Sequence, residues 1–110
     1  MDSQLRIAYI TTENREEARK IGSALVEKKL VACVNIIEGM ESMYWWKGEV
    51  ETDNECILIG KTTKAHVDEL TTVVKELHSY EVPCVITYQI SGEEGNPEYI
   101  NWLYQSVKPS

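Results

Sequence analysis

The sequence predicts an α+β domain, a βαββαβ sandwich with a long central hairpin and an extra C-terminal helix. Segments with the residue preferences of strands alternate along the chain with amphipathic segments of helical period. Two of the strand-like segments follow each other with no helix between them, which predicts a hairpin. The length of 110 residues is typical of one domain, so we expect residues 1–110 to form a single domain.

The first strand and the first helix occupy the N-terminal part. β-Branched and aromatic residues over 5–11 favour a strand. Asn14, with Glu17 three residues later, has the form of a capping box at a helix N-terminus. The residues that then recur on one helical stripe are Ala18, Ile21, Gly22, Leu25 and Val26. This pattern predicts an amphipathic helix that lies on a sheet.

The middle of the chain predicts two strands joined as one hairpin. Residues 30–37 are apolar at both odd and even positions, which is typical of a strand covered on both faces. Gly39 predicts a bulge or bend, after which residues 43–46 (Met-Tyr-Trp-Trp) continue the extended run. Residues 52–54 (Thr-Asp-Asn) predict the turn, and residues 56–62 the returning strand.

The C-terminal half adds a helix, a strand and a last helix. Thr62 or Thr63 predicts the cap of the second helix, and residues 84–90 predict the fourth strand. Asn96 and Pro97 suit the N-cap and the first position of the final helix. Two right-handed β-α-β crossovers that share a hairpin give the ferredoxin-like sandwich, whose antiparallel sheet carries both crossover helices on one face.

In residues 30–37 and 56–59 both the odd and the even positions are apolar, so both faces of these strands are apolar. A sheet that helices cover on one face only does not explain this pattern. Tyr44 and Trp46 add two rings to one face of the hairpin, and Trp45 adds one to the other. A large exposed apolar patch marks an interface, so we expect a symmetric oligomer. The alternative is that the C-terminal helix, with Tyr99 and Trp102, folds back over the open face of its own sheet. These arguments alone do not choose between a dimer and a trimer.

Composition excludes several classes of partner. The net charge is −7, and the 11 Lys and Arg residues are scattered, which disfavours nucleic acid. No apolar run is long enough to span a membrane, and the first residues lack the pattern of a signal peptide, so we expect a cytoplasmic protein. The three cysteines form no C-x-x-C pair and are expected to be free thiols. No motif of nucleophilic, metalloprotease or P-loop catalysis occurs, so we expect no enzyme activity.

A few residues are candidates for function, and each has a plainer interpretation. His78, where the second helix ends, is either a polar helix terminus or a metal ligand. Cys33 is either a core residue or a reactive thiol, and the core is the simpler interpretation. Lys61 is either a partly buried edge residue or an anion-binding group at the mouth of a pocket. The aromatic run 44–46 is either interface and core or the wall of a ligand pocket at a subunit boundary.

Five segments together resemble the CutA family of divalent-cation tolerance proteins over roughly residues 7–107. They are 30–35 (Leu-Val-Ala-Cys-Val-Asn), 44–48 (Tyr-Trp-Trp-Lys-Gly), 61–63 (Lys-Thr-Thr), 78–83 (His-Ser-Tyr-Glu-Val-Pro) and 99–103 (Tyr-Ile-Asn-Trp-Leu). The resemblance implies ferredoxin-like subunits assembled as a homotrimer in the manner of PII signalling proteins. It also implies copper binding and tolerance to divalent cations, with no obligatory cofactor.

The resemblance assigns roles to particular residues of this chain. It implies metal ligands at His78 and Cys33, although Thr11 and Leu77 stand where some bacterial members have a second Cys and a second His. The residues expected to line a ligand pocket are Lys61, Tyr80, Glu81 and Trp46, and those expected in the trimer interface are Tyr44, Trp45, Tyr99 and Trp102. The function expected is binding of copper or another divalent cation by a homotrimer. The alternative is a PII-like sensor or scaffold that binds a small anion or a protein partner.

Overall fold

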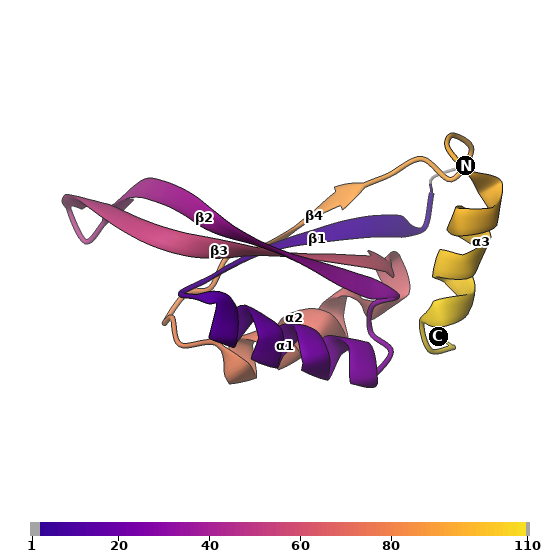
Figure 1. Ribbon diagram of the computed structural model, residues 1–110, viewed down its shortest axis with the longest axis horizontal. Helices are drawn as coiled ribbons and strands as arrows, with labels where there is room; N and C mark the ends of the chain where they lie inside the picture. The colour runs from indigo at the N-terminus through magenta and orange to yellow at the C-terminus, as the bar shows by residue number, and fades with distance from the viewer. Residues whose placement is uncertain (1–2, 110) are drawn as a thin grey trace.

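The computed structural model describes residues 3–109. The element order is β1 (Leu5–Thr12), α1 (Arg15–Glu27), β2 (Cys33–Trp46), β3 (Glu49–Thr63), a 3-10 turn (Lys64–His66), α2 (Val67–Leu77), β4 (Val85–Gln89) and α3 (Pro97–Ser106). The strands form one antiparallel sheet of order β2-β3-β1-β4, and α1 and α2 lie on one of its faces (Figure 1). The ferredoxin-like sandwich with a long hairpin and an extra C-terminal helix is therefore confirmed. Among residues 3–109, no helix is long and apolar enough to cross a bilayer.

Two of the three predicted helix caps are confirmed. The Asn14 side chain accepts a 2.9 Å hydrogen bond from the backbone N–H of Glu17. The Asn96 side chain accepts one of 3.0 Å from Glu98, and Pro97 is the first residue of α3. The predicted threonine cap of the second helix is wrong, because Thr63 precedes a 3-10 turn and makes no side-chain capping bond.

The hairpin is longer than predicted because its turn lies elsewhere. The predicted turn at residues 52–54 is wrong: these residues continue β3 and pair with Glu41, Ser42 and Met43 of β2. The chain turns instead at Lys47 and Gly48, which have φ of 51° and 85°. Two successive positive φ values suit a two-residue hairpin loop, whose twist matches that of the strands. The bulge predicted at Gly39 is confirmed by the register shift between Ile37 and Met40.

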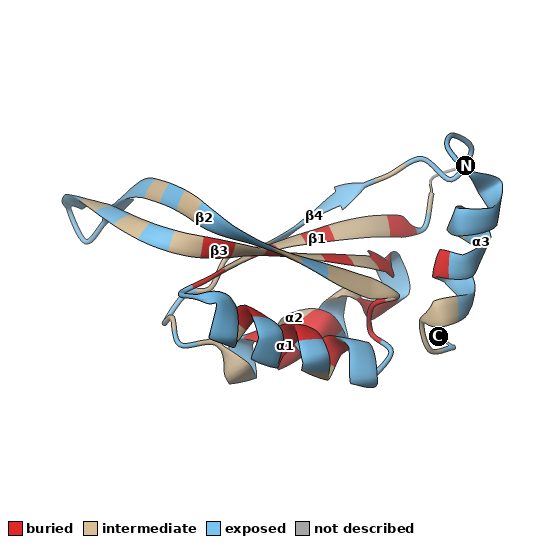
Figure 2. Cartoon of the chain, in the orientation of Figure 1, coloured by how far each residue is buried: buried red, intermediate tan, exposed pale blue. Residues whose placement is uncertain are grey.

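The core lies between the sheet and the two crossover helices (Figure 2). Its largest fully buried side chains include Ile10, Ile21, Leu25, Leu30, Leu58, Leu70 and Val74. Leu30 and Val31 are buried in a bend before β2, whereas we predicted that the strand begins at Leu30. Val31 fills the space above Gly60, where a Cβ would lie only 3.0 Å from the Val31 Cγ1 atom. The glycine therefore allows the bend to pack directly on β3.

The opposite face of the sheet is largely uncovered. The register places on it Ile7, Tyr9, Ile37, Ile57, Ile59, Ile86 and Tyr88, and we call this set the open face. Ile37, Ile86 and Tyr88 are 47%, 49% and 56% exposed. Helix α3 stands at one end of the sheet and buries its Leu103 there (Figure 1). The alternative that the C-terminal helix covers this face within one chain is therefore wrong.

Candidate functional site

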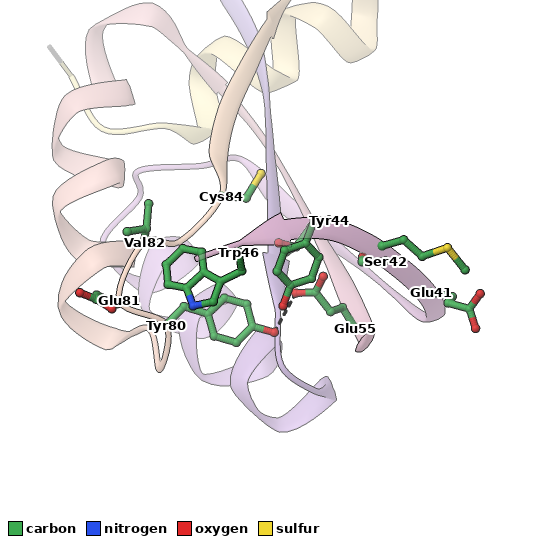
Figure 3. A pocket seen from close by; sticks show the side chains of 11 residues that line it. Glu41, Ser42, Tyr44, Trp46, Glu55, Tyr80, Glu81, Val82 and Cys84 are labelled. Atoms are coloured by element: carbon green, nitrogen blue, oxygen red, sulfur yellow. Dashed lines mark hydrogen bonds between the residues drawn. The ribbon is translucent and has the colours of Figure 1, made fainter. Parts of the chain in front are cut away.

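A cavity of about 690 Å³ lies between the outer half of the β2–β3 hairpin and the loop that joins α2 to β4 (Figure 3). We call it the hairpin cavity. Side chains alternate along strands, so Ser42, Tyr44 and Trp46 of β2 share one side of the hairpin with Glu55 of β3. The register continues this side into the open face. The lining residues are Thr11, Glu41, Ser42, Met43, Tyr44, Trp46, Glu55, Tyr80, Glu81, Val82 and Cys84.

Two phenols in the cavity donate hydrogen bonds to carboxylates. The Tyr80 hydroxyl donates to Glu55 Oε2 at 2.7 Å, and the Tyr44 hydroxyl donates to Asp53. Burial and the hydrogen bond to Glu55 raise the pKa of Tyr80 well above its usual range. The hydrogen bond to Asp53 raises the pKa of Tyr44 to about 12. Both phenols are therefore neutral at physiological pH and leave the negative charge on their carboxylate partners.

One cation of the chain lies at the edge of the cavity. Lys47 Nζ is 5.5 Å from the centroid of the Trp46 ring and 3.9 Å from a carboxylate oxygen of Glu81. Three glutamates line the cavity, and no Lys or Arg is found among the described residues that line it. The cavity thus combines electron-rich ring faces with an excess of negative charge.

His78 holds the loop that carries Tyr80. Its side chain is fully buried, and Nε2 lies 2.7 Å from the carbonyl oxygen of Thr11, so this nitrogen donates. Nδ1 accepts a 3.0 Å hydrogen bond from the backbone N–H of Tyr80. Its 3.7 Å approach to Glu17 is therefore no ion pair in this tautomer. Both ring nitrogens are occupied, which leaves no lone pair for a metal ion in this conformation.

Cys33 lies in a second cluster at the other end of the sheet. Its sulfur is 3.8 Å from the Tyr99 hydroxyl, which also accepts a 3.1 Å hydrogen bond from Lys61 Nζ. That hydrogen bond raises the pKa of Lys61, which therefore stays charged. The Tyr99 ring stacks on Trp102 with centroids 5.3 Å apart. This cluster joins α3 to the ends of β2 and β3.

The structure does not bring the two candidate metal ligands together. His78 contacts Thr11, which pairs with Ile57, whereas Cys33 pairs with Lys61. Four residues of β3 separate the two levels, a distance of about 13 Å. No group of three His, Cys, Asp or Glu side chains that could hold a metal ion occurs within the described range 3–109.

The predicted pocket residues fall into two groups. Trp46, Tyr80 and Glu81 line the hairpin cavity together, but Lys61 belongs to the cluster with Tyr99. Of the predicted interface residues, Tyr44 lines the cavity and Trp45 points to the other side of the hairpin, where it is 75% exposed.

Sequence reasoning predicted Glu81 in the cavity but missed the two glutamates of the hairpin, Glu41 and Glu55. A turn at residues 52–54 would set Glu55 at the tip of the hairpin, whereas it lies in the middle of β3. In the true register Glu55 pairs with Met40, which sets it on the inner side of the hairpin within reach of Tyr80. A two-residue turn at Lys47 and Gly48 was the signal in the sequence that would have given this register.

The family model described as "CutA1 divalent ion tolerance protein" matches residues 6–106. The divalent-cation tolerance protein CutA of Thermus thermophilus is 45% identical over 101 residues, which cover 92% of this chain and 96% of the relative. The chloroplastic protein CutA 1 of Oryza sativa is 44% identical over 104 residues, 94% of this chain. The chain spans 58% of that relative and 55% of the chloroplastic Arabidopsis thaliana CutA.

Solved structures agree with these matches. CutA1 from Oryza sativa superposes with a TM-score of 0.92 at 41% identity, covering 99% of this chain and 98% of that one. The Cut A1 protein of Thermus thermophilus superposes with a TM-score of 0.89 at 43% identity, covering 94% and 99%. The resemblance read from the five sequence segments is confirmed. The chain belongs to the CutA1 divalent ion tolerance protein family.

Proposed function

We propose that the protein is a non-enzymatic homotrimer that binds copper or another divalent cation and contributes to the response to metal ions. The proposed assembly is based on the open face. Ile37 on β2 and Ile86 and Tyr88 on β4, the two edge strands of the sheet, are about half exposed, so the uncovered apolar surface extends across its whole width. Full burial of a large apolar side chain contributes about 1.5–3 kcal/mol, and a side chain that is half exposed has about half of this left to gain. Copies of the chain that pack sheet against sheet would recover this free energy, and the family resemblance favours three copies.

The cation-binding part of the proposal rests on the family and on the carboxylates. The sequence holds 18 Asp and Glu residues and 11 Lys and Arg residues. Oxygen ligands of this kind bind Mg²⁺, Ca²⁺ or Mn²⁺, whereas copper prefers nitrogen and sulfur donors. Copper binding therefore requires donors such as His78 or Cys33 to become available in the assembly. In one chain His78 uses both ring nitrogens for backbone hydrogen bonds.

Two measurements test this proposal. Size-exclusion chromatography with light scattering at dilute concentration should give three times the 12.6 kDa mass of the chain. Calorimetric titration of the reduced protein with Cu²⁺ and with Mn²⁺ should show binding of at least one of them. A monomer would refute the assembly, and no heat with either ion would refute cation binding. Cu²⁺ binding that is unchanged in both His78→Ala and Cys33→Ser would exclude these two residues as ligands.

Lys61 supports the alternative, a PII-like sensor or scaffold that binds a small anion or a protein partner. Its ammonium group stays charged and lies beside the open face, next to Tyr99 and Cys33. An anion bound there would stabilise the folded protein. Inorganic phosphate should then raise the melting temperature of the protein but not that of a Lys61→Gln variant. An equal rise in both proteins would exclude Lys61 as the anion-binding group.

A further inference from the structure

The hairpin cavity has a composition that neither a metal ion nor an anion explains. Its walls present the rings of Tyr44, Trp46 and Tyr80, which come from β2 and from the loop after α2 (Figure 3). Glu55 and Glu81 line the same cavity. Aromatic faces attract cations through their quadrupole, and carboxylates add direct attraction. We propose that the hairpin cavity binds an organic cation with an ammonium head group.

The hydrogen bonds of the phenols prepare the cavity for a cation. Tyr80 and Tyr44 direct their protons to Glu55 and Asp53, so their rings are neutral and their hydroxyl dipoles are fixed. The carboxylates keep their negative charge next to the rings. A bound ammonium group would contact ring faces on one side and carboxylate oxygens on the other.

The chain already shows this mode of contact at the edge of the cavity. The ammonium group of Lys47 lies over the Trp46 ring at 5.5 Å and near the Glu81 carboxylate at 3.9 Å. Both distances are within the range at which a cation is attracted to a ring and to a carboxylate. The same two side chains line the cavity and can receive a second cation from its interior.

Size and donor geometry favour an organic cation over a metal ion. The volume of about 690 Å³ lies in the range of small-molecule pockets and far exceeds that of a single ion. A metal ion needs several donors that converge on one point, and no such group of three occurs in the part of the chain that the structure describes. The glutamates disfavour an anion. This inference goes beyond the proposed function, because it concerns a different ligand.

The test uses the intact wild-type protein and two ammonium probes, choline and n-butylamine. Choline is compared with 3,3-dimethyl-1-butanol, which has the same shape but no charge. If the proposal is correct, the trimethylammonium protons of choline shift upfield in NMR spectra on binding, because they lie over ring faces. The neutral alcohol should bind at least about fivefold more weakly. Failure of both ammonium probes to bind, or equal binding of the alcohol, would overturn the proposal.

Matched variants locate the site. Trp46→Leu removes a ring of the cavity, and Trp45→Leu removes the neighbouring ring that points to the other side of the hairpin. Glu55→Gln removes a charge but keeps an acceptor for Tyr80, and Glu93→Gln removes a charge from the distant loop before α3. The first member of each pair should weaken choline binding about fivefold or more, and the second should leave it unchanged. Equal effects within either pair would overturn the assignment.

The assembly state of each variant is checked by light scattering in the same samples. This control separates the inference from the proposed function. If a cavity variant loses choline binding while its assembly state is unchanged, the loss is due to the cavity and not to dissociation. If the protein is a monomer that still binds choline, the homotrimer is refuted and the organic-cation site is supported.

Discussion

The Tyr80 hydroxyl donates a 2.7 Å hydrogen bond to Glu55 Oε2 and so connects the loop after α2 to the middle of the long hairpin. The two residues are 25 positions apart in sequence. His78 fixes the same loop through its bonds to Thr11 and to the backbone of Tyr80. These contacts give the hairpin cavity a defined wall.

Removal of this connection should destabilise the protein. The variant Tyr80→Phe keeps the ring but leaves Glu55 without its donor, and we expect a loss of about 1 kcal/mol in the free energy of unfolding. Chemical denaturation followed by far-ultraviolet circular dichroism measures it. Tyr104→Phe, which removes a hydroxyl from an exposed ring of α3, is the control and should change little. Equal losses in the two variants would contradict a specific role of the Tyr80 bond.

Glu17 should make stability depend on pH in the acid range. Burial raises its pKa, but hydrogen bonds from the Glu13 backbone and from Ser79 outweigh burial and lower the pKa below the ordinary value of 4.5. A lowered folded-state pKa stabilises the protein above the unfolded-state pKa, and this stability is lost as pH falls through the folded-state value.

The test compares two glutamates of the same helical turn. Glu17→Gln should flatten the decline of the melting temperature below pH 4.5 relative to wild type. Glu16→Gln changes an exposed neighbour in the first turn of α1 and should preserve the wild-type profile. A Glu17→Gln profile identical to that of wild type would show that this carboxylate does not contribute.

Gly60 should not tolerate a side chain. In Gly60→Ala the new Cβ would lie 3.0 Å from Val31 Cγ1, so we expect a loss of about 1–3 kcal/mol in the free energy of unfolding. The control is Gly92→Ala, whose nearest neighbour would be 3.6 Å away. Because the clash is with Val31, adding Val31→Ala should cost less in the Gly60→Ala background than in wild type. Strict additivity would exclude the clash as the cause.

A charge on the open face should dissociate the proposed homotrimer. Ile86 is 49% exposed in one chain, and Ile86→Glu would place a carboxylate in the buried interface. We expect light scattering to show a shift toward 12.6 kDa particles at micromolar concentration. Val26→Glu is the control, because Val26 is similarly exposed but lies on α1, away from the open face. Dissociation by the control alone would place the interface on the helical side.

Sequence patterns correctly predicted the features that depend on contacts between residues close together in the sequence. Asn14 and Asn96 cap helices because the side chain of each reaches a backbone N–H two or three residues away. Gly39 marks the bulge for an equally local reason. The hairpin turn was predicted at the wrong place, because the polar residues 52–54 suit a turn and equally suit a strand that extends into solvent. Composition does not distinguish these two structures.

The sequence by itself determined the order of the elements, the amphipathic helices and the apolar surplus on the sheet, because these depend on periodicity and on short-range hydrogen bonds. Only the tertiary structure decided the hairpin register, and with it the meeting of Glu55 with Tyr80. Only the tertiary structure showed that both ring nitrogens of His78 form hydrogen bonds with the backbone. It also showed that Cys33 and Lys61 lie beside Tyr99, at the end of the sheet away from His78. Contacts between residues far apart in sequence depend on strand register, and a change of one position in register turns each side chain to the other face.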